Sequence, residues 1–197
     1  LKGGAANDSL LVSGRLVNSS VYAGQGNDTL NYIYTGADNL FQSEIRLGAG
    51  EDYLLGGKTK LNGLLVSLDG EEGDEKDGND TMDIEQLSGS TVYGRGGDDI
   101  ISAPEGRYLA WGGDDADTFE TLNGGKGFMK IMDLQPEDKI TFCGCASTRI
   151  EEFGKKGQHA RIVKGDDIKA IVKGVKAEDL NIDFENAVIT LNPDPLA

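Results

Sequence analysis

Short apolar runs alternate with turns rich in glycine and aspartate between residues 3 and 120 of the chain. Runs such as "SSVYAG", "EIRLG", "GLLVSL", "STVYG" and "YLAWG" lead into each glycine turn, and a second short run follows it. Runs of β-branched and aromatic residues bounded by glycine and aspartate are typical of short strands. The pattern therefore predicts an all-β structure for this part of the chain.

The glycine turns are copies of one nine-residue pattern, G-G-x-G-x-D-x-U-x, in which U is a large apolar residue. Five copies are continuous: "GGAANDSLL" from Gly3, "AGQGNDTLN" from Ala23, "LGAGEDYLL" from Leu47, "YGRGGDDII" from Tyr93 and "GGDDADTFE" from Gly112. A sixth copy is divided, because the acidic insert "EEGDEKD" separates "DG" at 69–70 from "GNDTM" at 78–82. The apolar residue two places after each aspartate is Leu10, Leu30, Leu54, Met82, Ile100 or Phe119.

The spacing of the copies predicts the architecture. Consecutive copies, which begin at Gly3, Ala23, Leu47, Asp69, Tyr93 and Gly112, are separated by close to two nine-residue units. Two such units make one coil with two short strands and two turns. Variable segments such as "SGRLVNSS" and "GGKTKLNG" supply the opposite turns. A coil cannot bury its apolar face without neighbours, so successive coils must stack. We expect a right-handed parallel β-roll, a solenoid, over residues 1–122.

The glycine turns have the chemistry of a site for a hard cation. Glycine lets a backbone carbonyl turn inward where a side chain would clash, and the aspartate adds a carboxylate oxygen. Calcium prefers six to eight oxygen ligands of these two kinds.

On these motifs, from residue 3 to about 120, the chain resembles the repeats-in-toxin family, the hemolysin-type calcium-binding repeats. The resemblance implies a parallel β-roll with calcium between the glycine turns of successive coils, and six stacked turns would enclose about five ions. The ions would form one file, since only "TGADNL", with Asp38, echoes the motif on the opposite edge. The side-chain ligands implied are Asp8, Asp28, Asp52, Asp80, Asp98 and Asp117. The implied sites also include Asp69, Asp115 and the turn residues Gly3, Gly24, Gly26, Gly48, Gly50, Gly78, Gly94, Gly96 and Gly112.

The acidic insert lacks the D-x-[DN]-x-[DN]-G pattern followed by glutamate that defines an EF-hand. It is interpreted either as a solvated loop that extends one coil or as an additional weak ion site.

From residue 123 the period disappears, and we expect residues 123–197 to form a β-rich C-terminal cap. "HARIVKGDDIKAIVKG" predicts a hairpin. The segment "KIMDLQPEDKI" resembles the one that commonly ends such arrays, and Asp133 and Asp138 in it either bind a last ion or are purely structural. Cys143 and Cys145 are unusual for the family, and three states stay open: free or externally paired thiols, a local disulfide, or a metal site.

Charge and motif content narrow the classes of function. The formal charge is −15, with 34 acidic and 19 basic residues, which argues against a partner that is nucleic acid or an anionic membrane. No apolar run has the length that a transmembrane helix requires. With one histidine and neither H-E-x-x-H nor G-x-S-x-G, no catalytic activity is expected. Tyr22, Tyr93 and Trp111 precede glycine turns and are interpreted as packing residues or as a platform for stacking glycans.

The sequence therefore predicts an extracellular or cell-surface calcium-binding module that folds on binding calcium, after export by type I secretion. The start at Leu1 and the ending "LNPDPLA" suggest a piece of a longer protein. Two alternatives are a non-catalytic folding tail of a secreted enzyme or toxin, and an adhesin or carbohydrate-binding module. Other surface proteins and glycans are the partners that these interpretations imply.

Overall fold

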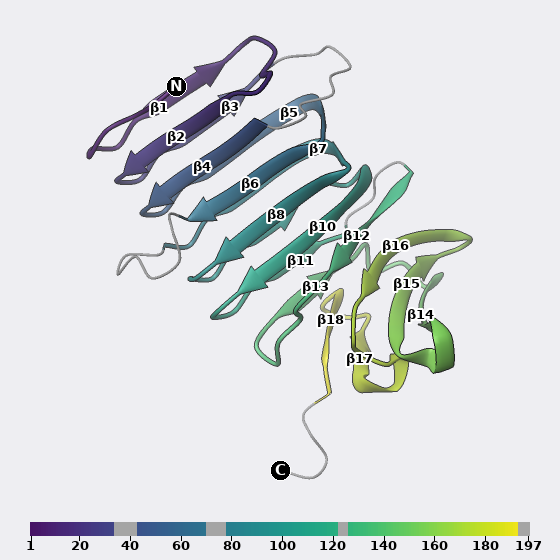
Figure 1. Ribbon diagram of the computed structural model, residues 1–197. Coiled ribbons are helices and arrows are strands. Elements are labelled where there is room, and N and C mark those ends of the chain that lie inside the picture. The colour runs from purple at the N-terminus through teal and green to yellow at the C-terminus, as the bar shows by residue number, and fades with distance from the viewer. Residues whose placement is uncertain (34–42, 70–77, 122–125, 193–197) are drawn as a thin grey trace.

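The computed structural model describes residues 1–33, 43–69, 78–121 and 126–192. Asp38 and the acidic insert lie outside the described residues, so the predictions made for them stay predictions. The described chain forms two nine-stranded sheets that face each other as a parallel β-solenoid (Figure 1). The all-β parallel solenoid expected from the repeat is confirmed.

The chain alternates between the two sheets, so each coil contributes one strand to each. Sheet one has the order β1 (Ser9–Val12), β3 (Thr29–Tyr32), β5 (Tyr53–Asn62), β7 (Thr81–Ser88), β9 (Ile100–Ser102), β11 (Thr118–Glu120), β13 (Lys139–Thr141), β18 (Val188–Leu191) and β17 (Leu180–Asp183). Sheet two has the order β14 (Thr148–Phe153), β15 (His159–Lys164), β16 (Asp167–Val172), β12 (Gly127–Ile131), β10 (Gly106–Gly113), β8 (Ser90–Arg95), β6 (Leu64–Asp69), β4 (Ser43–Ala49) and β2 (Ser20–Gln25). Two short 3-10 helices, η1 (Lys155–Gly157) and η2 (Ala177–Asp179), lie in the C-terminal part.

The core consists of residues in register across neighbouring coils. In sheet one, the residue two places after each turn aspartate pairs with its counterpart in the next coil, which stacks Leu10, Leu30, Leu54, Met82, Ile101, Phe119 and Ile140. In sheet two, the facing row is Val21, Ile45, Val66, Val92, Ala110 and Ile131. All but Leu10 are buried. Each coil thus buries its apolar side chains against its two neighbours, as a solenoid requires.

The pairing changes direction towards the C-terminus. Parallel pairing continues past residue 122 into β12, β13 and β16, and the remaining strands β14, β15, β17 and β18 are antiparallel to their neighbours. Ala160, Ile162 and Ile189 from these strands join the same apolar core as the coils. The C-terminal strands therefore extend both sheets and share one apolar core with the coils.

A disulfide joins Cys143 to Cys145 in the loop after β13, with the two Cα atoms 5.2 Å apart. Of the three states left open by the sequence, the structure has the local disulfide. None of the helices in the described part of the chain is long and apolar enough to cross a membrane.

Candidate metal-binding site

The turn aspartates lie in one file along the edge where the chain passes from sheet two to sheet one. Each stands immediately before a strand of sheet one, from Asp8 before β1 to Asp138 before β13. All but the first are buried, with at most 1% of the residue exposed: Asp28, Asp52, Asp80, Asp99, Asp117 and Asp138. A file of buried carboxylates in successive coils is an arrangement that folded proteins avoid unless the charge is compensated.

One oxygen of each carboxylate is used by the fold itself. The backbone N–H of Asp8 donates to Oδ1 of Asp28 at 2.7 Å, and the N–H of Asp28 donates to Oδ1 of Asp52 at 2.6 Å. The same bond recurs through Asp80, Asp99, Asp117 and Asp138 at 2.7 to 3.0 Å. The Oδ1 atoms therefore form a ladder that ties each turn to the preceding coil.

The second carboxylate oxygen, Oδ2, has no hydrogen-bond donor at four positions in the middle of the file. Oδ2 of Asp28, Asp52, Asp99 and Asp117 is buried and accepts no hydrogen bond. A Cβ placed on Gly112 would overlap Oδ2 of Asp117, so this oxygen lies directly beneath the glycine turn. A buried carboxylate oxygen without a partner carries a desolvation penalty of about 1–3 kcal/mol or more.

The two ends of the file differ from the middle. Oδ2 of Asp8 accepts the N–H of Gly4 at 2.7 Å, and Oδ2 of Asp138 accepts the N–H of Gln135 at 2.7 Å. The protein thus satisfies the terminal carboxylates with its own backbone and leaves Oδ2 of Asp28, Asp52, Asp99 and Asp117 without a hydrogen bond.

Backbone carbonyls stack next to these carboxylates. A Cβ on Gly24 would collide with the carbonyl oxygen of Gly4, and one on Gly48 with that of Gly24; both residues have positive φ, 128° and 117°. Gly50 and Gly78 lie equally close to carbonyls of the preceding turn. Only glycine permits this approach, and it brings carbonyl oxygens into the gaps between turns.

The structure corrects one expected ligand. Asp99, and not Asp98, occupies the file, while Asp98 is exposed and its Oδ1 accepts the N–H of Ala116 at 3.0 Å. Accordingly Ile101 faces the core in place of Ile100. The copy begins at Gly94 and not at Tyr93, and the available signal was the separation of 18 residues between Asp99 and Asp117, which is one ideal coil.

Other predicted site residues take varied positions. Gly97 has a φ of 89°, and a Cβ on it would collide with the carbonyl oxygen of Gly78. It therefore makes the close backbone approach that was expected of Gly96. The N–H of Gly96 donates to Asp69, a fully buried residue at the end of β6. Asp115 is exposed and accepts the N–H of Gly97 at 3.4 Å.

Of the two acids in the array-ending segment, Asp138 continues the file and Asp133 accepts the N–H of Gly112 at 3.0 Å.

Burial sets the protonation of the file. Desolvation, opposed by the backbone hydrogen bond and reinforced by the neighbouring aspartate, raises the pKa of Asp52 to about 6 and that of Asp117 to about 8. For Asp99 the same causes raise the pKa to about 10. Burial also raises the pKa of Asp28 and of Asp138. Burial without a cation therefore favours the protonated form of Asp99 and Asp117 near neutral pH.

The described residues contain no cluster of three or more His, Cys, Asp or Glu side chains that could hold a metal. The carboxylates are spread out instead, one per coil, at the strand spacing of about 4.8 Å. Any cation here would take carboxylate oxygens from two successive turns and complete its shell with turn carbonyls.

Comparisons with known proteins add no identification. No protein-family model matches the chain, and no curated protein is similar to it.

Proposed function

We propose that this chain is an extracellular calcium-binding β-roll module of the repeats-in-toxin type, without catalytic activity, that completes its folding when calcium enters the gaps between the glycine turns. The observation that carries the proposal is the set of buried Oδ2 atoms of Asp28, Asp52, Asp99 and Asp117 without hydrogen-bond partners. Each is a buried carboxylate oxygen whose burial must be offset by a proton or by a bound cation, and a cation shared between successive turns would do so for the ionised form.

The donor set favours calcium among the common cations. The gaps offer carboxylate and carbonyl oxygens, which suit hard cations, and no nitrogen or sulfur ligand of the kind that zinc prefers. Magnesium demands a small octahedral shell and keeps several waters, which a row of fixed backbone carbonyls does not accommodate. Calcium tolerates six to eight ligands in irregular geometry.

Cation binding and folding would be one process. The ligands of each gap come from two successive coils and meet only when the coils stack, so no site exists in the unfolded chain, and binding free energy adds to folding free energy. A formal charge of −15 opposes compaction until cations offset it. Low calcium inside a cell and high calcium outside would then restrict folding to the exterior.

Two neighbouring aspartates provide a matched test. Asp99→Asn keeps an oxygen for the ladder bond and removes the charge that a cation needs, whereas Asp98→Asn changes an exposed residue one position away. Calcium titrations followed by calorimetry and circular dichroism should show at least one ion fewer for Asp99→Asn, or a tenfold loss of affinity at one site, and no change for Asp98→Asn. In chelator, Asp99→Asn should be more stable than the parent, because asparagine resembles the protonated carboxyl. Equal calcium affinity in both variants would contradict the proposal.

A further inference from the structure

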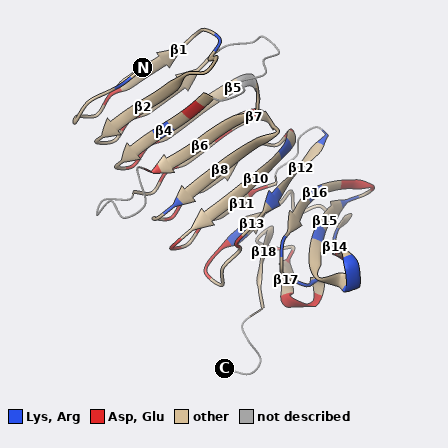
Figure 2. Ribbon diagram, in the orientation of Figure 1, with Lys and Arg blue, Asp and Glu red and all other residues tan. Residues whose placement is uncertain are grey.

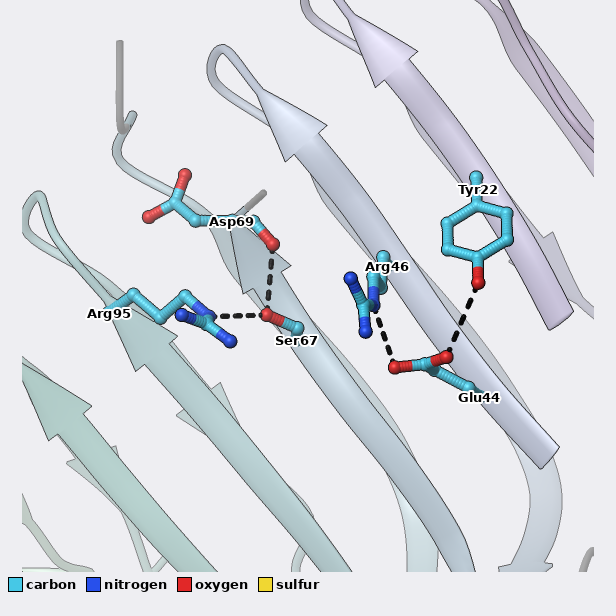
Figure 3. A network of polar contacts seen from close by, with 6 residues as sticks. All are labelled: Tyr22, Glu44, Arg46, Ser67, Asp69 and Arg95. Carbon is cyan, nitrogen blue, oxygen red and sulfur yellow. Dashed lines mark hydrogen bonds and ion pairs between the residues drawn. The ribbon is translucent and has the colours of Figure 1, made fainter. Parts of the chain in front are cut away.

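The outer face of sheet two divides into two halves with different chemistry. On β2, β4 and β6, polar side chains engage one another: Arg46 donates to Glu44 at 2.7 Å, and Tyr22 donates to the same carboxylate at 3.4 Å (Figure 3). Arg95 reaches from β8 to Ser67 at 2.7 Å. In this half the charged groups are already engaged with their neighbours.

The other half, on β8, β10 and β12, contains no acidic residue. These strands have the sequences "STVYGR", "GRYLAWGG" and "GFMKI", in a chain with 34 aspartates and glutamates. Their basic residues are visible in blue in Figure 2. Arg107 is exposed and Lys130 is half-buried, and the ion pairs among the described residues involve neither of them. This half therefore carries basic side chains that are not engaged in ion pairs, on a strongly acidic protein.

Aromatic rings lie on the same face. Tyr93 and Trp111 pair in register on β8 and β10, their ring centroids 4.8 Å apart and their planes inclined by 25°. Both rings project away from the core and are half-exposed, so they pack against each other on the outer face and not in the core. Tyr93 therefore stacks on one face of the Trp111 ring.

A groove runs beside the basic residues and Phe128, and Tyr93 and Trp111 lie on the same face outside its lining. One hollow of about 280 Å³ is lined by Thr91, Arg107, Leu109, Phe128 and Lys130 among others. A second of about 580 Å³ shares Arg107 and Phe128 with it and continues past Lys126 to Asp166 and Asp167 at the β15–β16 turn. Asp167 is paired with Lys169 at 2.7 Å. The guanidinium of Arg107 lies 5.3 Å from the centre of the Phe128 ring, which holds it over the groove.

We propose that this face, defined by Tyr93, Arg107, Leu109, Trp111, Phe128 and Lys130, binds an anionic oligosaccharide. Sugar rings present apolar C–H faces that pack on aromatic rings, and Trp111 and Phe128 supply such rings. Carboxylate or sulfate groups on the sugars pair with Arg107, whose planar fork can form two parallel hydrogen bonds, and with Lys130. Arg107 and Trp111 are four residues apart on one strand, about 13 Å, so the ligand spans more than one sugar unit.

The test uses the full chain in excess calcium and four defined polymers of matched length. Hyaluronan fragments carry carboxylates, chondroitin sulfate fragments add sulfates, dextran is a neutral glycan, and polyglutamate is an anion without sugar rings. Calorimetry should detect binding of one or both acidic sugars and neither of dextran nor of polyglutamate. Which acidic sugar binds more tightly identifies the preferred acid group. Polyglutamate binding as tight as that of the sugars, dextran binding, or no binding of either acidic sugar would overturn the proposal.

Matched variants locate the site. Arg107→Gln should lower the affinity for the acidic sugar at least tenfold, and Trp111→Phe should weaken it by a smaller factor, because a smaller ring remains. Arg149→Gln, on β14 outside the groove, removes the same charge and should leave affinity unchanged. Arg107 is exposed, so its substitution should not affect folding. An unaltered affinity for Arg107→Gln, or an equal loss for Arg149→Gln, would place binding elsewhere and refute the assignment.

Discussion

The coil array and the C-terminal strands bury their polar groups in opposite ways. In the array, Asp52 and Asp117 are buried with one oxygen unsatisfied, and the strands run parallel. In the C-terminal part, Glu151 stays partly exposed between Arg149 and Arg161, at 2.5 and 2.6 Å, on antiparallel strands. In the array, buried carboxylate oxygens lack a hydrogen-bond donor, so a bound cation would be needed to stabilise their charge. In the C-terminal part, Arg149 and Arg161 already compensate the charge of Glu151. Dependence on a cation should therefore be a property of the array and not of the whole chain.

The largest expected effect is that of calcium removal. In excess chelator, backbone amides of β3, β5, β7 and β9 should lose protection in hydrogen exchange, because the buried carboxylates repel one another without a cation. Amides of the antiparallel strands β14, β15 and β16 should lose protection later. Mass spectrometry of exchange resolves the two regions. Protection that is unchanged in the array would contradict the cation requirement. Simultaneous loss in both regions would show that the C-terminal strands depend on calcium as much as the array does.

Substitution of a glycine should destabilise the array more than the C-terminal part. Gly48→Ala places a Cβ against the carbonyl of Gly24 at a φ of 117°, which adds a clash to the backbone strain. We expect a loss of at least ~3 kcal/mol in the free energy of unfolding. Gly174→Ala, in the C-terminal part, has a φ of 80° but open space around it, so strain alone should cost about 1 kcal/mol. Denaturant titrations in saturating calcium measure both, and equal losses would show that close turn stacking is unimportant.

Position within the file should have a smaller, graded effect. Asp52→Ala removes a proposed ligand between two intact turns, whereas Asp8 belongs to the terminal coil and its Oδ2 already accepts the N–H of Gly4. Solenoid stability depends on interfaces between neighbours, so the melting temperature in calcium should fall by several degrees for Asp52→Ala and by about one degree or less for Asp8→Ala. Similar decreases for the two variants would argue against a file of shared sites.

The effect of pH should change sign with calcium. Burial raises the pKa of Asp52 to about 6 and of Asp117 to about 8, so the folded, metal-free chain binds more protons than the unfolded one. Its stability should rise as pH falls from about 9 to 5. In calcium the trend should reverse, since protons compete with the cation for the same oxygens. Thermal melts at several pH values, with and without chelator, measure both slopes.

The C-terminal part should contribute a pH dependence of the opposite sign to the metal-free array. Hydrogen bonds from Arg149 and Arg161 lower the pKa of Glu151. Stability from this group is present above its unfolded pKa and is lost as pH falls through the folded one. The protection factors of β14 and β15 amides, which correct for the slower intrinsic exchange in acid, should therefore fall below the ordinary pKa of glutamate, after the metal-free array has gained its stability at higher pH.

Much of the array could be predicted from the sequence because a period of about two nine-residue units repeats the same local physics in every coil. In each coil a glycine turn is followed by an aspartate, and an apolar residue stands two places after it. These positions predict the turn, the buried carboxylate and the row of core side chains from the sequence of the coil. The same period also relates Tyr93 to Trp111, which occupy equivalent positions in successive coils and stack in the structure. That equivalence was the available signal for the aromatic pair on the outer face.

The one-residue choice between Asp98 and Asp99 was not decided by local sequence. Two aspartates and two isoleucines follow one another there, and only the register with β7 and β11 selects Asp99 and Ile101 for the interior. The sequence also left the cysteines open, and the loop after β13 brings them close enough to join.

The coil, its strands and the acidic turn edge could thus be predicted from the residues alone, because these features repeat with the period of the sequence. Tertiary structure alone decided which carboxylate oxygens are satisfied. Oδ1 of Asp52 is paired because the backbone of a neighbouring coil donates to it, while its Oδ2 is left without a donor once the turns close over it. The groove of Arg107, Phe128 and Lys130 likewise exists only where three coils lie side by side. Hydrogen bonding and burial depend on what lies across the gap between coils, and no local pattern specifies that.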